Sequence, residues 1–200
     1  MLPPAQLAAV LGTLALGSAR GPWFRALGYR HLLGPPPGLT GPPQLLWGGA
    51  ASRMGARFTP QGGFDSIYLA GDPVTALVEI SALVLLPDGP VSVRTSPWVM
   101  VSVAGRLSRV LDLTAPATLA ALGTTEQEVT GPWVMDPHPP TQRLARAAYD
   151  SGRIAGIKYR SAKHPDGLNL VVFPDRLAGA VGEFLEVYDP HRNLRQRIGA

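Results

Sequence analysis

The chain has 200 residues, of which 46% are hydrophobic and 16% charged, so it fits a folded domain and excludes an intrinsically disordered protein. It has no cysteine, and its histidines (His31, His138, His164 and His191) lack metal-ligand spacing, so we expect no disulfide and no metal site. The net charge of +4 is dispersed except in residues 191–197, which favours attraction of an anionic small molecule over direct binding of nucleic acid.

Residues 5–21, AQLAAVLGTLALGSARG, resemble either a secretory signal or a helix. The six residues before Leu7 carry no lysine or arginine, which a typical signal would have. The apolar run is also too short to span a bilayer. We therefore expect residues 1–21 to form a helical extension on a domain of residues 22–200, in a cytoplasmic protein with no membrane segment. A signal peptide is the alternative.

The next segments predict a loop, a strand and a helix. Residues 34–43, GPPPGLTGPP, are typical of a stiff surface loop, and residues 66–70 of a short strand. Asp72 then has the place of an N-cap, with Pro73 at the first position of a helix that we expect to continue to about Leu83.

Glu79 is the only charged residue between Pro73 and Pro87. Its apolar neighbours cover most of the circumference of the expected helix, so the helix is buried on more than one side. A buried carboxylate needs a charged or hydrogen-bonding partner. The alternative is an exposed glutamate, the more common case. The sequence leaves both open.

Five further segments have the composition of strands, and they are residues 91–103, 109–113, 154–161, 168–173 and 183–189. Pro97 predicts a bend or a sheet edge within the first of them.

Two further helices are expected. Thr114 is expected to cap a helix of residues 115–122 that Gly123 closes, and Thr141 to begin a helix that Gly152 ends. Thr125 also stands three residues before Glu128, the spacing of a capping box.

Strands and helices are mixed without regular alternation. This predicts an α+β fold, a single domain with a small mixed or antiparallel β core flanked by helices. The glycine-rich phosphate-binding motifs of dinucleotide-binding and P-loop proteins are absent.

Four polar or aromatic residues beside Glu79 are candidates for a site. Arg57 and Tyr68 precede Glu79 at intervals of 11 residues, and Ser161 and Asn169 lie at the ends of two expected strands joined by a glycine-containing loop. Each has a structural alternative: Arg57 could pair with Glu79, Tyr68 could be a core aromatic, and the other two could belong to a plain hairpin.

Together these segments resemble the RES-domain family, which is named for an arginine, a glutamate and a serine. The resemblance rests on WFRALGYRHL, GARFTPQGG, IYLAGDPVTALVE, RVLDLTAPATLAALG and residues 141–173, in this order. It assigns Arg57, Glu79 and Ser161 to the three named positions. Thr59 stands where the family commonly has asparagine, and Lys163 where it commonly has arginine.

The resemblance implies a fold related to ADP-ribosyltransferase toxins and an enzyme that acts on NAD. Family members are typically toxins that deplete NAD by hydrolysis or phosphorolysis, and some transfer ADP-ribose to a protein. The partner it implies is an antitoxin with a helix-turn-helix part. The alternatives are a transferase that modifies a protein and a basic binding module without enzymatic activity.

The residue types suit this chemistry. Cleavage of the nicotinamide–ribose bond builds positive charge on the ribose, which a fixed carboxylate stabilises, and the step needs no metal. The roles that we expect are stabilisation of the ribose by Glu79, binding of the pyrophosphate by Arg57 and Arg25, stacking by Tyr68, and orientation of substrate or carboxylate by Ser161 and Asn169.

Overall fold

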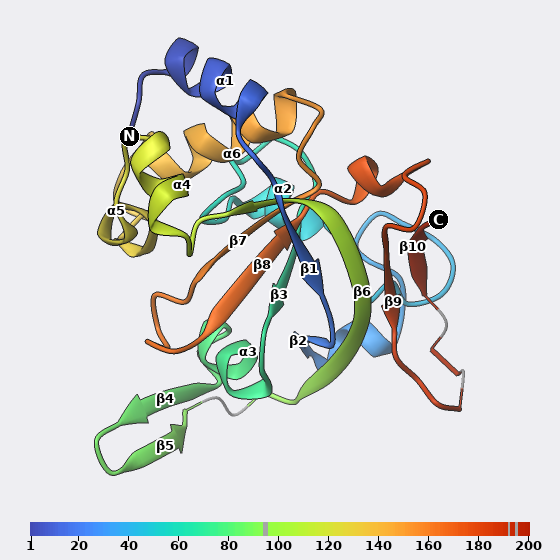
Figure 1. Cartoon of the computed structure of the whole chain (residues 1–200). Coiled ribbons are helices and arrows are strands. Elements are labelled where there is room, and N and C mark those ends of the chain that lie inside the picture. The colour runs from blue at the N-terminus through green and yellow to red at the C-terminus, as the bar shows by residue number, and fades with distance from the viewer. Residues whose placement is uncertain (94–95, 192, 195) are drawn as a thin grey trace.

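The computed structural model describes residues 1–93, 96–191, 193–194 and 196–200 (Figure 1). The α-helices in these residues are α1 (Pro4–Thr13), α2 (Gly49–Met54), α3 (Pro73–Glu79), α4 (Pro116–Ala121), α5 (Glu126–Thr130) and α6 (Pro140–Asp150). Two 3-10 helices are η1 (Tyr29–Leu32) and η2 (Pro174–Leu177). The strands are β1 (Gly17–Arg20), β2 (Trp23–Gly28), β3 (Ile67–Ala70), β4 (Leu83–Leu86), β5 (Gly89–Ser92), β6 (Trp98–Asp112), β7 (Gly156–Arg160), β8 (Leu168–Val172), β9 (Phe184–Val187) and β10 (Arg197–Gly199).

A mixed, eight-stranded sheet forms the centre, in the order β10-β9-β6-β2-β3-β8-β7 with β1 beside β6. The 15-residue strand β6 pairs antiparallel with β2 near its start and parallel with β7 at its end. Hydrogen-bonded pairing also links β2 to β3, β3 to β8 and β8 to β7. The additional pairing of β6 with β7 therefore makes the sheet curl back on itself (Figure 1). The expected α+β fold with a central sheet and flanking helices is confirmed.

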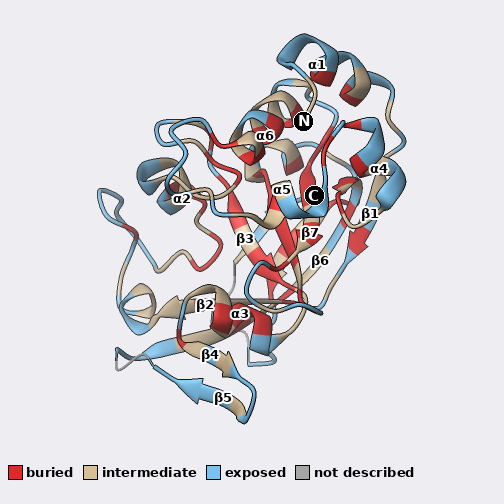
Figure 2. Cartoon of the chain, turned by 90° about the vertical axis from the view of Figure 1, so that its left-hand side faces the viewer, coloured by how far each residue is buried: buried red, intermediate tan, exposed pale blue. Residues whose placement is uncertain are grey.

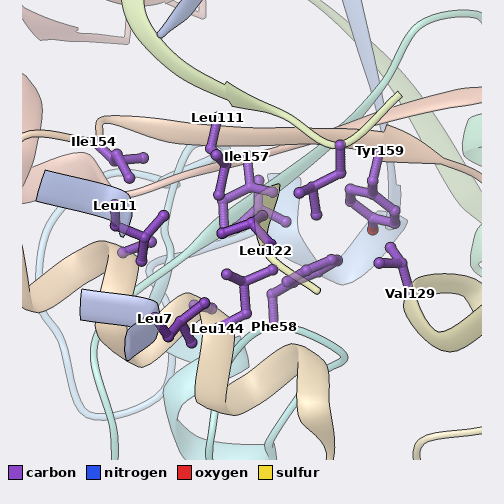
Figure 3. Packing of buried hydrophobic residues seen from close by; sticks show 14 of the residues in the cluster. Leu7, Leu11, Phe58, Leu111, Leu122, Val129, Leu144, Ile154, Ile157 and Tyr159 are labelled. Carbon is purple, nitrogen blue, oxygen red and sulfur yellow. The ribbon is translucent and has the colours of Figure 1, made fainter. Parts of the chain in front are cut away.

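Alternation along the strands separates two apolar clusters. Leu69 and Leu170 face one side with Trp23, while Val171 and Tyr159 face the other. The second side packs against the helices, where leucines of α1 and α6 meet Phe58 and the β7 side chains (Figure 3).

The N-terminal segment packs directly on this domain. Residues 4–13 of the expected helical extension form α1, but residues 17–20 form β1, which pairs with β6 in the central sheet. Leu7 and Leu11 of α1 are 1% and 0% exposed and belong to the same cluster as Leu144 of α6. The buried residues Thr141, Leu144 and Ala148 of α6 follow helical spacing, so one stripe of this helix faces the core (Figure 2). None of the helices in the described part of the chain has the length and apolarity needed to cross a bilayer.

Helix α3 begins where expected and ends earlier. Asp72 is its N-cap, with the Thr75 amide donating to Oδ1 at 2.8 Å. The helix stops at Glu79 rather than near Leu83, because Ser81 adopts a left-handed conformation with φ 56°. The amides of Ser81 and Ala82 donate to the carbonyls of Val78 and Leu77, which is a Schellman motif. Glu79 therefore lies in the last helical position.

The region after α3 departs further from expectation. Leu83 begins β4, which forms a separate, largely exposed hairpin with β5 (Figures 1 and 2). The expected strand of residues 91–103 is wrong as one element: it splits between the end of β5 and the start of β6, and residues 94 and 95 lie outside the described residues. The segment 109–113 is not a separate strand, because it continues β6.

Two expected helix caps are wrong. Thr114 donates its hydroxyl to Asp112 instead of accepting from α4, which begins after Ala115 without a side-chain cap. Thr141 lies inside α6, and its hydroxyl donates to the carbonyl of Arg57.

Only one of the two hydrogen bonds of the expected capping box forms, and four expected strands agree with the structure. Thr125 caps α5, but Glu128 binds Thr124 and the N-terminal amine instead of reaching back to Thr125. The strands expected at 66–70, 154–161, 168–173 and 183–189 are confirmed as β3, β7, β8 and β9.

Candidate active site

A cavity of about 200 Å³ lies between α3 and the strands β2, β3, β7 and β8. Its wall includes four of the six site residues expected from the sequence, namely Arg25, Tyr68, Glu79 and Asn169. A larger hollow of about 540 Å³, beside the start of α6, contains none of the six. The smaller cavity is therefore the candidate site, because polar groups converge on it.

The Glu79 carboxylate is half-buried and held by one of its oxygens. Oε1 accepts hydrogen bonds from the Ser161 hydroxyl at 2.7 Å and from the Asn169 amide at 2.6 Å. Among the described residues no donor reaches Oε2. Two donors thus fix the orientation of the carboxylate and leave its second oxygen available.

The hairpin of β7 and β8 brings these two donors together. Ser161 and Asn169 are 5% and 3% exposed, so both are buried; Asn169 lines the cavity, whereas Ser161 contacts Glu79 without lining it. The Ser161 hydroxyl oxygen also accepts from the amides of Lys163 and His164, each at 3.1 Å. Its hydrogen is therefore directed at Glu79. The hairpin alternative and the site prediction are compatible, since the hairpin carries the donors.

The loop that follows Ser161 is attached to both ends of α3. Lys163 Nζ donates to the carbonyl of Glu79 at 2.8 Å and to the hydroxyl of Ser81 at 3.1 Å. His164 Nδ1 lies 2.7 Å from the hydroxyl of Thr75, which donates to Asp72 at the start of the helix. These contacts position α3, and with it Glu79, on the hairpin.

Tyr68 is half-buried, and its hydroxyl is already hydrogen-bonded. It accepts from the Phe58 amide at 3.0 Å and lies 2.9 Å from the hydroxyl of Thr59. Burial raises the pKa of Tyr68 to about 12, so it stays protonated at neutral pH. Thr59 thus orients Tyr68, at the position where the family commonly has asparagine.

Arg57 is near the cavity without pairing with Glu79. Its Nη1 donates to the carbonyls of Val129 and Gly131, at 3.0 and 2.7 Å. The ion pairs of the described residues do not include Arg57 with Glu79, so the structural salt bridge considered above is not formed. Arg57 directly precedes Phe58, whose amide donates to the Tyr68 hydroxyl and whose ring contacts Tyr159, so Arg57 lies next to the cavity wall without being part of it.

Arg25 lines the cavity and also donates hydrogen bonds to the segment of residues 45–47. Nη1 and Nη2 donate to the carbonyls of Leu45 and Trp47, at 2.8 and 3.1 Å. Burial lowers the pKa of Arg25 to about 10, which leaves the guanidinium charged at neutral pH. Its two terminal nitrogens are thus already partly occupied.

Tyr159 and Phe24 line the cavity but were not singled out from the sequence. Tyr159 precedes Ser161 by two residues, so strand alternation alone would have placed both on one face. Phe24 had no comparable signal. No group of three or more histidines, aspartates or glutamates in the described residues is arranged to hold a metal ion.

The fold and the site describe an α+β domain whose curved sheet presents one oriented carboxylate to a small cavity. The model of the RES domain family matches residues 34–194, so the chain belongs to the RES domain family. That match contains Arg57, Tyr68, Glu79, Ser161 and Asn169 and leaves out Arg25.

Among solved structures, the chain is similar to one in the crystal structure of the M. tuberculosis MbcT–MbcA toxin–antitoxin complex. The TM-score is 0.66 at 20% sequence identity, and the match covers 92% of this chain and 90% of that chain. At this identity the similarity establishes the fold. No curated protein matches the chain.

Proposed function

We propose that the chain is a toxin that consumes NAD by cleaving the bond between nicotinamide and ribose. The observation that carries the proposal is the Glu79 carboxylate, which Ser161 and Asn169 hold by one oxygen beside a cavity. Membership of the RES domain family supports it. The similar structure is that of a toxin–antitoxin complex, which supports a toxin role and an antitoxin as partner.

The chemistry follows from the charge that develops on the substrate. When the glycosidic bond of NAD breaks, its electron pair goes to the cationic pyridinium nitrogen and nicotinamide leaves as a neutral molecule. Positive charge then appears on the ribose, as in glycoside cleavage. A carboxylate that is already oriented stabilises this charge without reorganising. Glu79 has this role, and no general acid is needed for the leaving group.

The cavity receives one end of the dinucleotide. Its volume of about 200 Å³ is below the roughly 300–1,000 Å³ that is usual for drug-sized ligands. The nicotinamide–ribose end therefore enters, against Tyr68, while the pyrophosphate stays near the rim. Arg57 is the stronger candidate for the pyrophosphate, because its guanidinium donates to the rest of the described chain through Nη1 alone. Arg25 is the second candidate.

The acceptor of the ribose decides the reaction class. Water would give ADP-ribose, phosphate would give its 1-phosphate, and a protein side chain would give an ADP-ribosylated protein. All three share the bond cleavage at Glu79. The antitoxin of such a toxin would cover the cavity, and we propose the helix-turn-helix type for it.

Incubation of the purified chain with NAD tests the proposal. We expect nicotinamide release, and the second product, measured with and without phosphate and with added cell protein, identifies the acceptor. Glu79→Gln serves as the matched inactive variant. Absence of nicotinamide release in all three conditions, at high protein concentration, would contradict the proposed function.

A further inference from the structure

Tyr159 is a buried tyrosine whose hydroxyl makes no hydrogen bond within the described part of the chain. The residue is 4% exposed and lines the cavity that holds Glu79. The neighbouring Tyr68 differs, because its hydroxyl is engaged by Phe58 and Thr59. In the described part of the chain, the unpaired side-chain polar atoms that are fully buried are Trp23 Nε1 and Arg176 Nε, so the unpaired Tyr159 hydroxyl is accessible from the cavity. A ligand that enters the cavity can therefore form a hydrogen bond with it.

The ring of Tyr159 is held in place by its neighbours. Its centroid lies 4.6 Å from that of Phe58 with the planes tilted by 56°, and Figure 3 shows the ring beside Phe58 and Val129. Tyr159 is also the direct cross-strand neighbour of Asn169, which binds Glu79. The β7–β8 pairing that positions Asn169 on the Glu79 carboxylate therefore also positions the Tyr159 hydroxyl.

The hydroxyl keeps its proton and acts as a donor at neutral pH. Burial raises the pKa of Tyr159 well above its usual value, and the nearby Tyr68 and Glu79 raise it further, while Arg57 opposes them. Glu79 supplies an acceptor, because its Oε2 has no donor among the described residues. The cavity therefore presents one donor and one acceptor to a ligand.

We propose that Tyr159 is a substrate-binding residue, whose hydroxyl donates a hydrogen bond to an uncharged oxygen of the nicotinamide–ribose end of NAD. This inference rests on the proposed function. Two oxygens have the required chemistry, the carboxamide oxygen and a ribose hydroxyl, and both accept a hydrogen bond from a phenol.

Binding of NAD in a slowed background tests this role. With Glu79→Gln as parent, we expect the addition of Tyr159→Phe to raise the Kd for NAD, measured by calorimetry, roughly three- to tenfold. The ring and its contact with Phe58 remain, so the thermal midpoint should not fall. Tyr149→Phe is the matched control, because its hydroxyl donates to Asp175 away from the cavity. This control should leave the Kd unchanged.

An analogue of NAD that carries a thioamide in place of the carboxamide identifies the oxygen. If Tyr159 binds the carboxamide, the effect of Tyr159→Phe disappears with the analogue, because sulfur is a weak acceptor. If it binds a ribose hydroxyl, the effect persists. Equal Kd values for the folded parent and the folded double variant would overturn the role of Tyr159 alone. Absence of NAD binding by both the wild-type chain and the parent would overturn the proposed function as well.

Discussion

The Ser161 hydroxyl lies 2.7 Å from Oε1 of Glu79, although 82 residues separate the two in sequence. Asn169 approaches the same oxygen from the next strand, at 2.6 Å. Helix α3 supplies the carboxylate and the β7–β8 hairpin supplies both donors. A carboxylate held in this way keeps one orientation and presents its other oxygen to the cavity.

Replacement of Glu79 by glutamine tests the carboxylate. The amide keeps the shape and still has an oxygen for Ser161 and Asn169, so the variant should fold. It lacks the negative charge that meets the cationic ribose, so NAD turnover should fall about a hundredfold or more. Turnover and the thermal midpoint are measured on the same preparation. Glu126→Gln, which changes a glutamate on α5 outside the cavity, is the control, and a folded Glu79→Gln with near wild-type turnover would reject the assignment.

Loss of the Ser161 hydroxyl should loosen the carboxylate. Ser161→Ala removes the bond to Glu79 and also the acceptor for the amides of Lys163 and His164. We expect a loss of about 1–3 kcal/mol in the free energy of unfolding, measured by urea denaturation, together with reduced turnover. Ser151→Ala removes a hydroxyl that bonds to the end of α6 and should leave turnover unchanged. Full turnover in Ser161→Ala would show that this hydroxyl does not orient Glu79.

Lys163 should stabilise the end of α3. Its ammonium group contacts the carbonyl of Glu79 and the hydroxyl of Ser81, at the negative end of the helix. Lys163→Met should lower the stability by about 0.3–1 kcal/mol, because the residue is exposed and screened by solvent. Lys163→Arg should retain most of the wild-type value. Equal thermal midpoints for the wild type and the methionine variant at low salt would contradict the capping role.

Acid should destabilise the protein in part through Glu183. Burial on its own would raise the pKa of this carboxyl, but hydrogen bonds from Arg109 and Ser108 outweigh burial and lower the pKa below 4.5. A lowered pKa in the folded state contributes stability above the unfolded value, and this contribution is lost as the pH falls through the folded value. Glu183→Gln should therefore flatten the dependence of stability on pH below about 4.5, measured by denaturation between pH 3 and 6. An unchanged slope would show that Glu183 does not contribute to acid unfolding.

Expression in cells tests the toxin role. If the chain consumes NAD, its induction alone should slow growth and lower cellular NAD, whereas Glu79→Gln at the same level of protein should do neither. Growth rate and NAD content are measured after induction, with immunoblotting to match the amounts of protein. Normal growth and normal NAD despite accumulated wild-type protein would count against a toxin.

Local sequence determined the elements whose ends are encoded by their own residues. Asp72 and Pro73 marked the start of α3, and Gly152 marked the end of α6, because caps and glycines act through neighbouring backbone groups. Strand composition likewise placed β3 and β8. The order of the motifs identified the RES domain family and the residues of the candidate site. A motif can be read from residue types and spacing alone, without knowledge of the contacts that those residues make.

Only the tertiary structure decided how those residues meet. Helix α3 ends at Glu79 because Ser81, a residue not typical of a left-handed position, is held there by the Schellman bonds and Lys163. Arg57 binds the carbonyls of Val129 and Gly131 rather than Glu79. The contacts of Arg57 and Lys163 join segments more than 70 residues apart, and no local pattern encodes them. The partners of the carboxylate were set by sheet register and helix packing, which depend on the whole chain being folded.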